Sequence, residues 1–142
     1  MADEEAVPPP PDGYVLSQGR GLFSTRNGPY FHRPDGPGAQ QAFYALKRHC
    51  NGVGLIHGGM LSAFLDGVLA GAAARGTGAT SVTIHLSIDF LDMGRAGEWV
   101  FGEANLTRAT KEVAFVEGRA FTGARTLARA TGIFKLMRRR ER

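Results

Sequence analysis

The sequence contains one long stretch with helical spacing, and every later stretch alternates with a period of two. From residue 58 to about residue 75, apolar side chains recur at intervals of three and four, which predicts a core helix about 27 Å long. Gly76 and Gly78 follow and are expected to end it. The opposite face carries mostly small residues, which leave room for another backbone or a ligand. The apolar positions are Met60, Leu61, Phe64, Leu65, Val68, Leu69 and Ala72.

Strands are expected on both sides of this helix. Short turns at 109–111 and 123–125 join the later ones, so we expect antiparallel pairs. The fold class is therefore α+β, with an antiparallel sheet covering one central helix. Within residues 81–91, alternation predicts a half-buried strand, with Val82, Ile84, Leu86, Ile88 and Phe90 on one side and Thr83, His85, Ser87 and Asp89 on the other. The other expected strands are near 29–33, 40–50, 98–110, 112–122 and 126–136.

The junction before the helix combines residue types suited to binding an oxygen ligand. It reads N-G-V-G-L-I-H-G-G from Asn51 to Gly59. Gly58 and Gly59 carry no side chain at the expected helix start, so the unpaired N–H groups of the first turn can approach a carbonyl oxygen or an anion closely. Asp66 lies further along, inside an apolar helix, which disfavours a carboxylate. We therefore expect a site that uses Asp66.

Length and composition limit the kind of protein. With 142 residues, the chain is expected to form a single domain over residues 14–137, after a disordered or extended Pro-rich lead-in at 1–13 and before a basic tail at 138–142. The composition, 43% hydrophobic and 21% charged, is that of a globular protein, and no apolar run approaches the roughly 20 residues of a membrane span. The acidic start lacks a secretory signal pattern, so we expect a cytoplasmic protein with no membrane partner.

Charge and single residues argue against other classes. The net charge of +4 includes a basic end, but no nucleic-acid-binding signature accompanies it, so we expect no nucleic acid partner. Cys50 is the single cysteine, which fits a reducing compartment, and we interpret it as a small buried hydrophobe. His32 and His49 are interpreted as surface or strand-end histidines. Neither has metal-ligand spacing, so no metal site is expected.

The junction motif N-x-x-G-x-x-H-G-G-x-x-x-x-x-x-D resembles the signature of PaaI-type acyl-CoA thioesterases, and a helix wrapped by a long antiparallel sheet resembles the hotdog fold of that family. The similarity covers roughly residues 40–136. Residues 81–91 resemble the family's next strand, in which Thr83 takes the place of a Ser or Thr near the reacting group. His85 departs from the family, which commonly has an acidic residue there. The matching motif positions are Asn51, Gly54, His57, Gly58, Gly59 and Asp66.

This resemblance implies hydrolysis of an acyl- or aryl-acyl-CoA thioester to free acid and CoA. The N–H of Gly58, with that of Gly59 as a further donor, would polarise the carbonyl, and Asp66 would act as general base or nucleophile. No cofactor is implied, because CoA is part of the substrate. The implied catalytic residues are Asp66, Gly58, His57, Asn51 and Thr83, with Asn51 and His57 positioning the thioester and Thr83 orienting Asp66 or water.

The resemblance also implies Arg108 and Lys111, at a turn between later strands, as contacts for the CoA phosphates. Exposed turn charges are an equally good interpretation of these two residues. Gly59, Arg108 and Lys111 are thus the substrate-binding candidates. Homologous hotdog domains can also bind acyl thioesters without hydrolysing them, so a sensor or carrier of acyl-CoA is the alternative function.

The junction has two other interpretations. Residues 52–57 nearly match a dinucleotide-binding G-x-G-x-x-G, but the sixth position is His57 and only antiparallel strand patterns follow the helix. A purely structural role would have His57 cap the helix and a buried hydrogen bond satisfy Asp66. Six matching motif positions in a strand-to-helix setting favour a functional site over both.

The length of the helix predicts an oligomer. Gly58 and Asp66 are about 12 Å apart along the axis, farther than one Asp side chain can span. If both act on one carbonyl, they belong to two antiparallel helices related by a two-fold axis, and a homodimer would contain two equivalent composite sites. A homotetramer built from such dimers is also compatible with the sequence.

Overall fold

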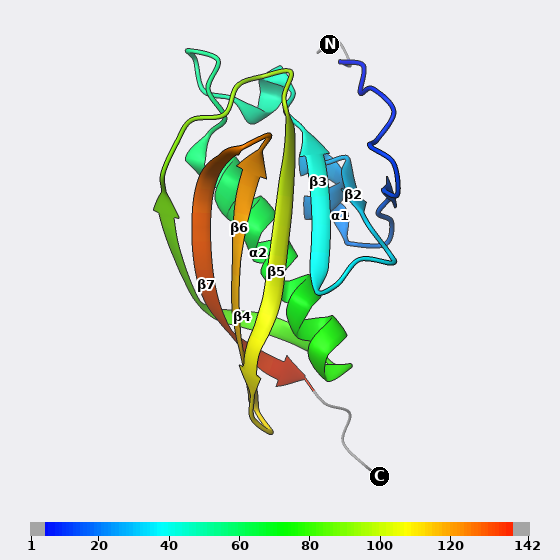
Figure 1. Ribbon diagram of the computed structural model, residues 1–142, viewed down its shortest axis with the longest axis vertical. Coiled ribbons are helices and arrows are strands. Elements are labelled where there is room, and N and C mark those ends of the chain that lie inside the picture. Colours follow the sequence, from blue (N-terminus) through cyan, green and yellow to red (C-terminus); the bar gives the residue numbers. More distant parts are fainter. Residues whose placement is uncertain (1–4, 138–142) are drawn as a thin grey trace.

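The structure is a computed structural model and describes residues 5–137. Its elements are β1 (Val15–Leu16), α1 (Leu22–Asn27), β2 (Tyr30–His32), β3 (Ala39–Tyr44), a 3-10 turn (Lys47–His49), α2 (Gly58–Thr77), β4 (Thr80–Phe90), β5 (Trp99–Ala109), β6 (Val113–Thr122) and β7 (Arg125–Met137). The strands form one seven-stranded antiparallel sheet in the order β1-β2-β3-β5-β6-β7-β4. Figure 1 shows α2 crossing one face of this sheet. The predicted α+β hotdog architecture is confirmed.

The core lies between α2 and the inner face of the sheet. Phe64, Val68 and Leu69 are fully buried there with side chains from β5, β6 and β7. A Cβ at Gly102 of β5 would lie 2.7 Å from Val68 Cγ2, so the glycine lets the helix approach the sheet closely. Gly78 follows α2 in the left-handed conformation at φ 71° and caps it, as the sequence predicts.

Strand β4 lies at one edge of the sheet and contains a β-bulge. Its register with β7 shifts between Thr83 and His85, so Ile84 is the extra residue. Before the bulge Thr83 pairs with the buried Phe134, and after it Leu86 is half-buried. Thr83 and Leu86 therefore both face α2, and the single alternation predicted for residues 81–91 is wrong.

The predicted half-burial of this strand is also only partly right. Leu86 and Ile88 are half-buried, but Val82, Ile84 and Phe90 are 50%, 57% and 55% exposed. The exposure follows from the edge position, because β4 has a neighbouring strand on one side only. A single chain thus presents an apolar edge strand whose outer backbone groups are unpaired within the sheet.

The region before α2 differs most from the sequence predictions. Strand β2 confirms the strand expected near 29–33. The strand expected over 40–50 is too long, because β3 ends at Tyr44 and a 3-10 turn follows. Helix α1 was not predicted, since it buries none of its residues and six residues show no helical period.

His49 is buried, with 3% of its surface exposed, so its interpretation as a surface or strand-end histidine is wrong. Its Nδ1 accepts a hydrogen bond from the Leu46 N–H at 3.0 Å, and its Nε2–H donates to the Asn27 carbonyl at 2.6 Å. These contacts fix the neutral tautomer. Burial lowers the pKa of His49, and the hydrogen bond to Asn27 opposes this shift. Through these two hydrogen bonds the His49 ring links the 3-10 turn to the end of α1.

The ends of the chain add little to the sheet. Residues 5–13 contain no helix or strand, and Glu5 Oε1 accepts a hydrogen bond from the Lys47 N–H at 2.7 Å. The expected basic tail at 138–142 lies outside the described residues. Within residues 5–137, none of the helices has both the length and the apolar character needed to span a membrane.

Candidate active site

The loop of residues 50–57, here called the junction loop, is shaped by its own hydrogen bonds. The Asn51 N–H donates to the Leu55 carbonyl at 2.8 Å, and Asn51 Oδ1 accepts from the N–H groups of Val53 and Leu55, each at 3.1 Å. Gly54 turns the chain at φ 80°. The Asn51 side-chain oxygen therefore shapes the loop. Its NH₂ group has no acceptor among residues 5–137 and is left to contact a ligand.

His57 caps the N-terminus of α2. Its Nδ1 accepts the Gly59 N–H at 2.8 Å, and its carbonyl accepts the N–H groups of Met60 and Leu61. The Gly58 N–H has no acceptor among residues 5–137. One free donor therefore remains at the positive end of the helix dipole. This is the Gly58 amide, whereas the Gly59 amide is already occupied.

The space beside Gly58 is open enough for a ligand. A Cβ at this position would meet the Phe90 ring at 3.5 and 3.6 Å, which is ordinary contact, and no other group lies within 4 Å. The His57 side chain is exposed next to it. Gly58 is itself half-buried, so part of its backbone is exposed in the single chain.

Asp66 lies further along α2 and is held by β4. Thr83 Oγ1 donates a hydrogen bond of 2.5 Å to Asp66 Oδ1. The bulge at Ile84 makes this contact possible, because it turns Thr83 towards the helix. One carboxylate oxygen is fixed by the hydroxyl, which leaves the other available for chemistry.

Asp66 lines a cleft of about 330 Å³, here called the Asp66 cleft. Its walls include Arg20, Phe23, Tyr30 and Leu86. None of these four residues was predicted as part of the site. Arg20, Phe23 and Tyr30 belong to the short elements and loops before β3, and Leu86 was expected only as an apolar strand residue. No motif or periodicity there connects them to Asp66.

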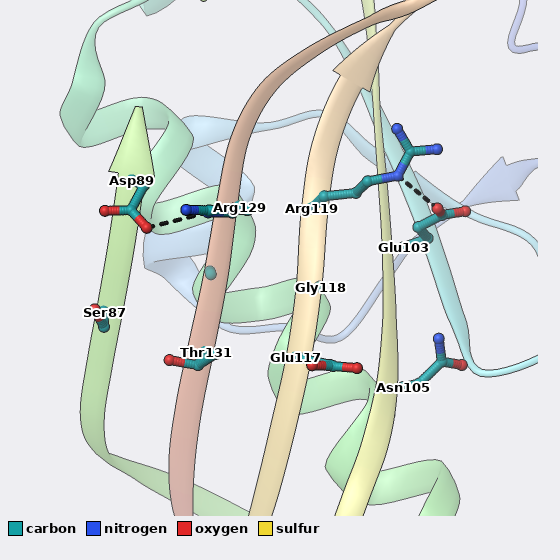
Figure 2. Close-up of a pocket in the computed structure, with 10 residues that line it drawn as sticks. Ser87, Asp89, Glu103, Asn105, Glu117, Gly118, Arg119, Arg129 and Thr131 are labelled. Carbon is teal, nitrogen blue, oxygen red and sulfur yellow. Dashed lines mark hydrogen bonds and ion pairs between the residues drawn. The ribbon is translucent and has the colours of Figure 1, made fainter. Parts of the chain in front are cut away.

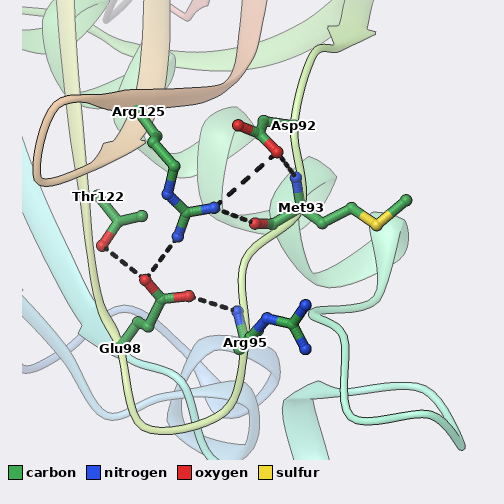
Figure 3. Close-up of polar contacts among 6 residues, drawn as sticks. All are labelled: Asp92, Met93, Arg95, Glu98, Thr122 and Arg125. Carbon is green, nitrogen blue, oxygen red and sulfur yellow. Dashed lines mark hydrogen bonds and ion pairs between the residues drawn. The ribbon is translucent and has the colours of Figure 1, made fainter.

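A polar network fixes the loop between β4 and β5 to the turn between β6 and β7 (Figure 3). Arg125 donates to Glu98 Oε2 and to the Met93 carbonyl, both at 2.7 Å, and its guanidinium lies 3.9 Å from Asp92. The same loop accepts the Ile56 N–H at the Gly94 carbonyl, at 2.8 Å. Arg125, next to the turn between β6 and β7, thereby fixes the loop that binds the junction loop just before His57.

Arg108 and Lys111 are not brought to this site within one chain. Arg108 is exposed near the end of β5, and Lys111 is exposed in the turn between β5 and β6. Figure 1 shows this hairpin end at the bottom of the sheet and the junction loop at the top. Arg108 and Lys111 therefore lie at the opposite end of the sheet from Gly58.

A separate cleft of about 350 Å³ lies on the outer face of the sheet (Figure 2). Four of its charged residues form a row across four strands, in which Arg129 pairs with Asp89 at 3.2 Å and Arg119 pairs with Glu103 at 2.7 Å, whereas Glu117 lies outside this row. The row contains no residue of the junction motif. Because both arginines are already paired, we assign the candidate site to the helix side.

Comparison with known proteins identifies the family. The Pseudomonas aeruginosa protein PA0474, named as a candidate esterase, is 35% identical over 114 residues, which is 77% of this chain and 84% of that protein. The family model of the thioesterase superfamily matches residues 53–128. The chain belongs to the thioesterase superfamily. The superfamily match includes His57, both glycines, Asp66 and Thr83.

Solved structures show the same hotdog fold. The Escherichia coli PaaI protein from the phenylacetic acid degradation operon has a TM-score of 0.66 at 24% identity, covering 70% of this chain and 72% of that chain. A hypothetical thioesterase from Streptococcus pneumoniae, solved with coenzyme A, has a TM-score of 0.71 at 18% identity, covering 79% and 91%. At these identities the likeness concerns the fold. The predicted resemblance to PaaI-type hotdog thioesterases is confirmed.

Proposed function

We propose that this superfamily member hydrolyses the thioester of an acyl-CoA to a free acid and CoA. The observation that carries the proposal is the contact between Thr83 and Asp66, which holds a carboxylate at the wall of a cleft on a helix that also presents a free N–H at its start. A carboxylate and an amide donor are the two groups that thioester hydrolysis needs. No cofactor takes part, because CoA is a portion of the substrate.

In the proposed reaction, the thioester carbonyl oxygen accepts a hydrogen bond from the Gly58 N–H. Asp66 removes a proton from water, whose oxygen attacks the carbonyl carbon, and the C–S bond then breaks to release CoA. Alternatively, the carboxylate attacks the carbonyl carbon itself and water hydrolyses the resulting anhydride. A donor placed like Gly58 typically stabilises the transition state by about 3 kcal/mol. The occupied Gly59 N–H would become a second donor after rotation of the His57 ring.

His57 and Asn51 would position the thioester. Because His57 Nδ1 accepts the Gly59 N–H, the neutral ring carries its hydrogen on Nε2, and this N–H can donate to the leaving sulfur. The free NH₂ group of Asn51 can donate to the carbonyl or to water. Both roles use donors that the local fold leaves unoccupied.

The proposed site is shared between two protomers. Gly58 and Asp66 of one chain are about 12 Å apart along α2, so one thioester carbonyl would meet Gly58 of one chain and Asp66 of its partner. Strand β4 supports this assembly, because its eleven residues form an exposed edge with apolar side chains at Val82 and Ile84. Antiparallel pairing of two such edges across a two-fold axis would pair the outer backbone groups of both strands and cover their apolar side chains.

The same pairing would give Arg108 and Lys111 a role. A two-fold axis across β4 reverses one protomer relative to its partner, so the β5–β6 turn of one chain comes to the end that carries the partner's junction loop. Arg108 and Lys111 would then contact the phosphates of CoA bound at that end. The basic side chains suit phosphate oxygens.

The test is steady-state release of free CoA from short, medium, long and aromatic acyl-CoAs. We expect turnover of at least one substrate, and we expect Asp66→Asn to lower kcat by about 100- to 10,000-fold, because the amide cannot accept the proton. Glu117→Gln, which removes a carboxylate on the outer face from β6, away from the proposed interface, is the matched control and should keep wild-type rates. Near wild-type turnover in Asp66→Asn would exclude this carboxylate. Binding of acyl-CoA without hydrolysis by the wild type would identify a carrier or sensor.

A further inference from the structure

Arg20 is a half-buried cation in the Asp66 cleft, and among residues 5–137 it makes no ion pair with a carboxylate. Its Nη1 donates to Gln41 Oε1 at 3.2 Å, and its guanidinium lies 4.7 Å from the centre of the Tyr30 ring. A Cβ at Gly67 would collide with Arg20 Nη2, so the glycine next to Asp66 provides the space for this guanidinium on α2.

The groups that contact Arg20 are neutral, although burial raises the free energy of its charged form. Burial lowers the pKa of Arg20, which reflects the loss of water around the cation. A partly desolvated guanidinium normally has an anionic partner that offsets this cost. Gln41 itself is fixed by a hydrogen bond from its Nε2 to the Gly67 carbonyl at 3.1 Å. These contacts therefore hold the Arg20 side chain in place, and they leave some of its N–H donors without an acceptor among residues 5–137.

Arg20 also lines other clefts besides the Asp66 cleft. Beyond the Asp66 cleft, a second cleft of about 410 Å³ continues along α2 to Arg75. Arg33 and His32 line this second cleft, and none of its lining residues is Asp or Glu. A ligand that extends from Asp66 past Arg20 thus passes from an apolar region with Phe23 and Tyr30 into a basic one.

We propose that Arg20 selects acyl groups that carry a carboxylate at the end distant from the thioester. This inference rests on the proposed function, which places the thioester carbon beside Asp66. The acyl chain would lie between Phe23 and Tyr30, and its terminal carboxylate would accept hydrogen bonds from the Arg20 guanidinium. An acyl group with an apolar end would leave the cation unpaired. The preferred substrate class is therefore the CoA monothioester of a dicarboxylic acid.

The first test compares kcat/KM for adipoyl-CoA and hexanoyl-CoA, which differ in the terminal carboxylate. We expect the wild type to prefer adipoyl-CoA and Arg20→Gln to lower the ratio of the two kcat/KM values by about 10- to 100-fold, the range for a hydrogen bond to a charged group. Arg20→Lys, which keeps the charge, should retain part of the preference. Arg129→Gln removes a cation from the outer face and should leave the ratio at its wild-type value.

A second test separates this inference from the proposed reaction. The affinities of both acyl-CoAs are measured by calorimetry in Asp66→Asn and in Asp66→Asn combined with Arg20→Gln, where turnover plays no part. Tighter binding of adipoyl-CoA that disappears with Arg20→Gln supports the inference, even if the wild type hydrolyses neither compound. Equal affinities in Asp66→Asn, or an equal loss of both on removing Arg20, would overturn it. Failure to bind either compound would overturn it together with the proposed function.

Discussion

The hydrogen bond between Thr83 and Asp66 fixes the orientation of the proposed base. Thr83→Val keeps the shape of the side chain and removes the hydroxyl, so the carboxylate loses its donor. We predict a fall in kcat of about tenfold with little change in KM, because the interaction involves a charged group. Thr83→Ser should restore most of the rate. Steady-state CoA release provides both constants, and an unchanged kcat in Thr83→Val would show that this hydroxyl does not position Asp66.

The same pair of residues shows what a sequence pattern reveals and what it does not. Regular alternation placed Thr83 on the side opposite Leu86, whereas both face α2 in the structure. The bulge at Ile84 causes the difference, and a one-residue bulge has no period from which it can be predicted. The expected proximity of Thr83 to Asp66 came from resemblance to a family motif. Arg20 belongs to no such motif, so only the folded chain revealed it.

At the scale of elements, the 3-10 turn and α1 are joined through a neutral, buried His49. Protonation of its Nδ1 would break the hydrogen bond from the Leu46 N–H. The pKa of His49 is lowered in the folded chain, so the unfolded chain binds more protons between the folded pKa and 6.5. This residue's contribution to stability is therefore complete above pH 6.5 and is lost as the pH falls through its folded pKa.

We predict that His49→Gln has a weaker pH dependence of stability than the wild type over this acidic range. Glutamine can still accept and donate at similar positions but does not titrate. Urea unfolding at a series of pH values measures the free energy of unfolding of both proteins. Parallel pH profiles for the two would contradict the assigned role of His49, whereas a uniform loss of stability in the variant would not.

Long elements were predictable from the sequence and short ones were not. The apolar spacing of α2 and the alternation in β5, β6 and β7 extend over enough residues to define their periods. The chain from β1 to the 3-10 turn has short elements, and contacts distant in the sequence decide its structure. An example is the hydrogen bond from His49 to the Asn27 carbonyl, which no local pattern contains.

At the scale of the whole molecule, the single chain separates the groups that the proposed reaction needs. The free Gly58 N–H lies at the start of α2, and Asp66 lies further along beside β4. The exposed apolar edge of β4 offers the surface through which a second protomer would complete the site. In the proposed dimer, each active site therefore combines Gly58 of one protomer with Asp66 of its partner.

The most direct test mixes two variants that are each expected to be inactive, Asp66→Asn and Gly58→Pro. Proline has no N–H, is tolerated at the first position of a helix, and follows His57, whose ψ of 136° is compatible with a following proline, so this variant is expected to fold without the donor. After subunit exchange, a mixed dimer has one site with both wild-type residues. Equal amounts should recover about one quarter of wild-type CoA release, since half of the dimers are mixed and each has one intact site. If exchange is shown to occur and the mixture stays as inactive as its components, the shared site is contradicted.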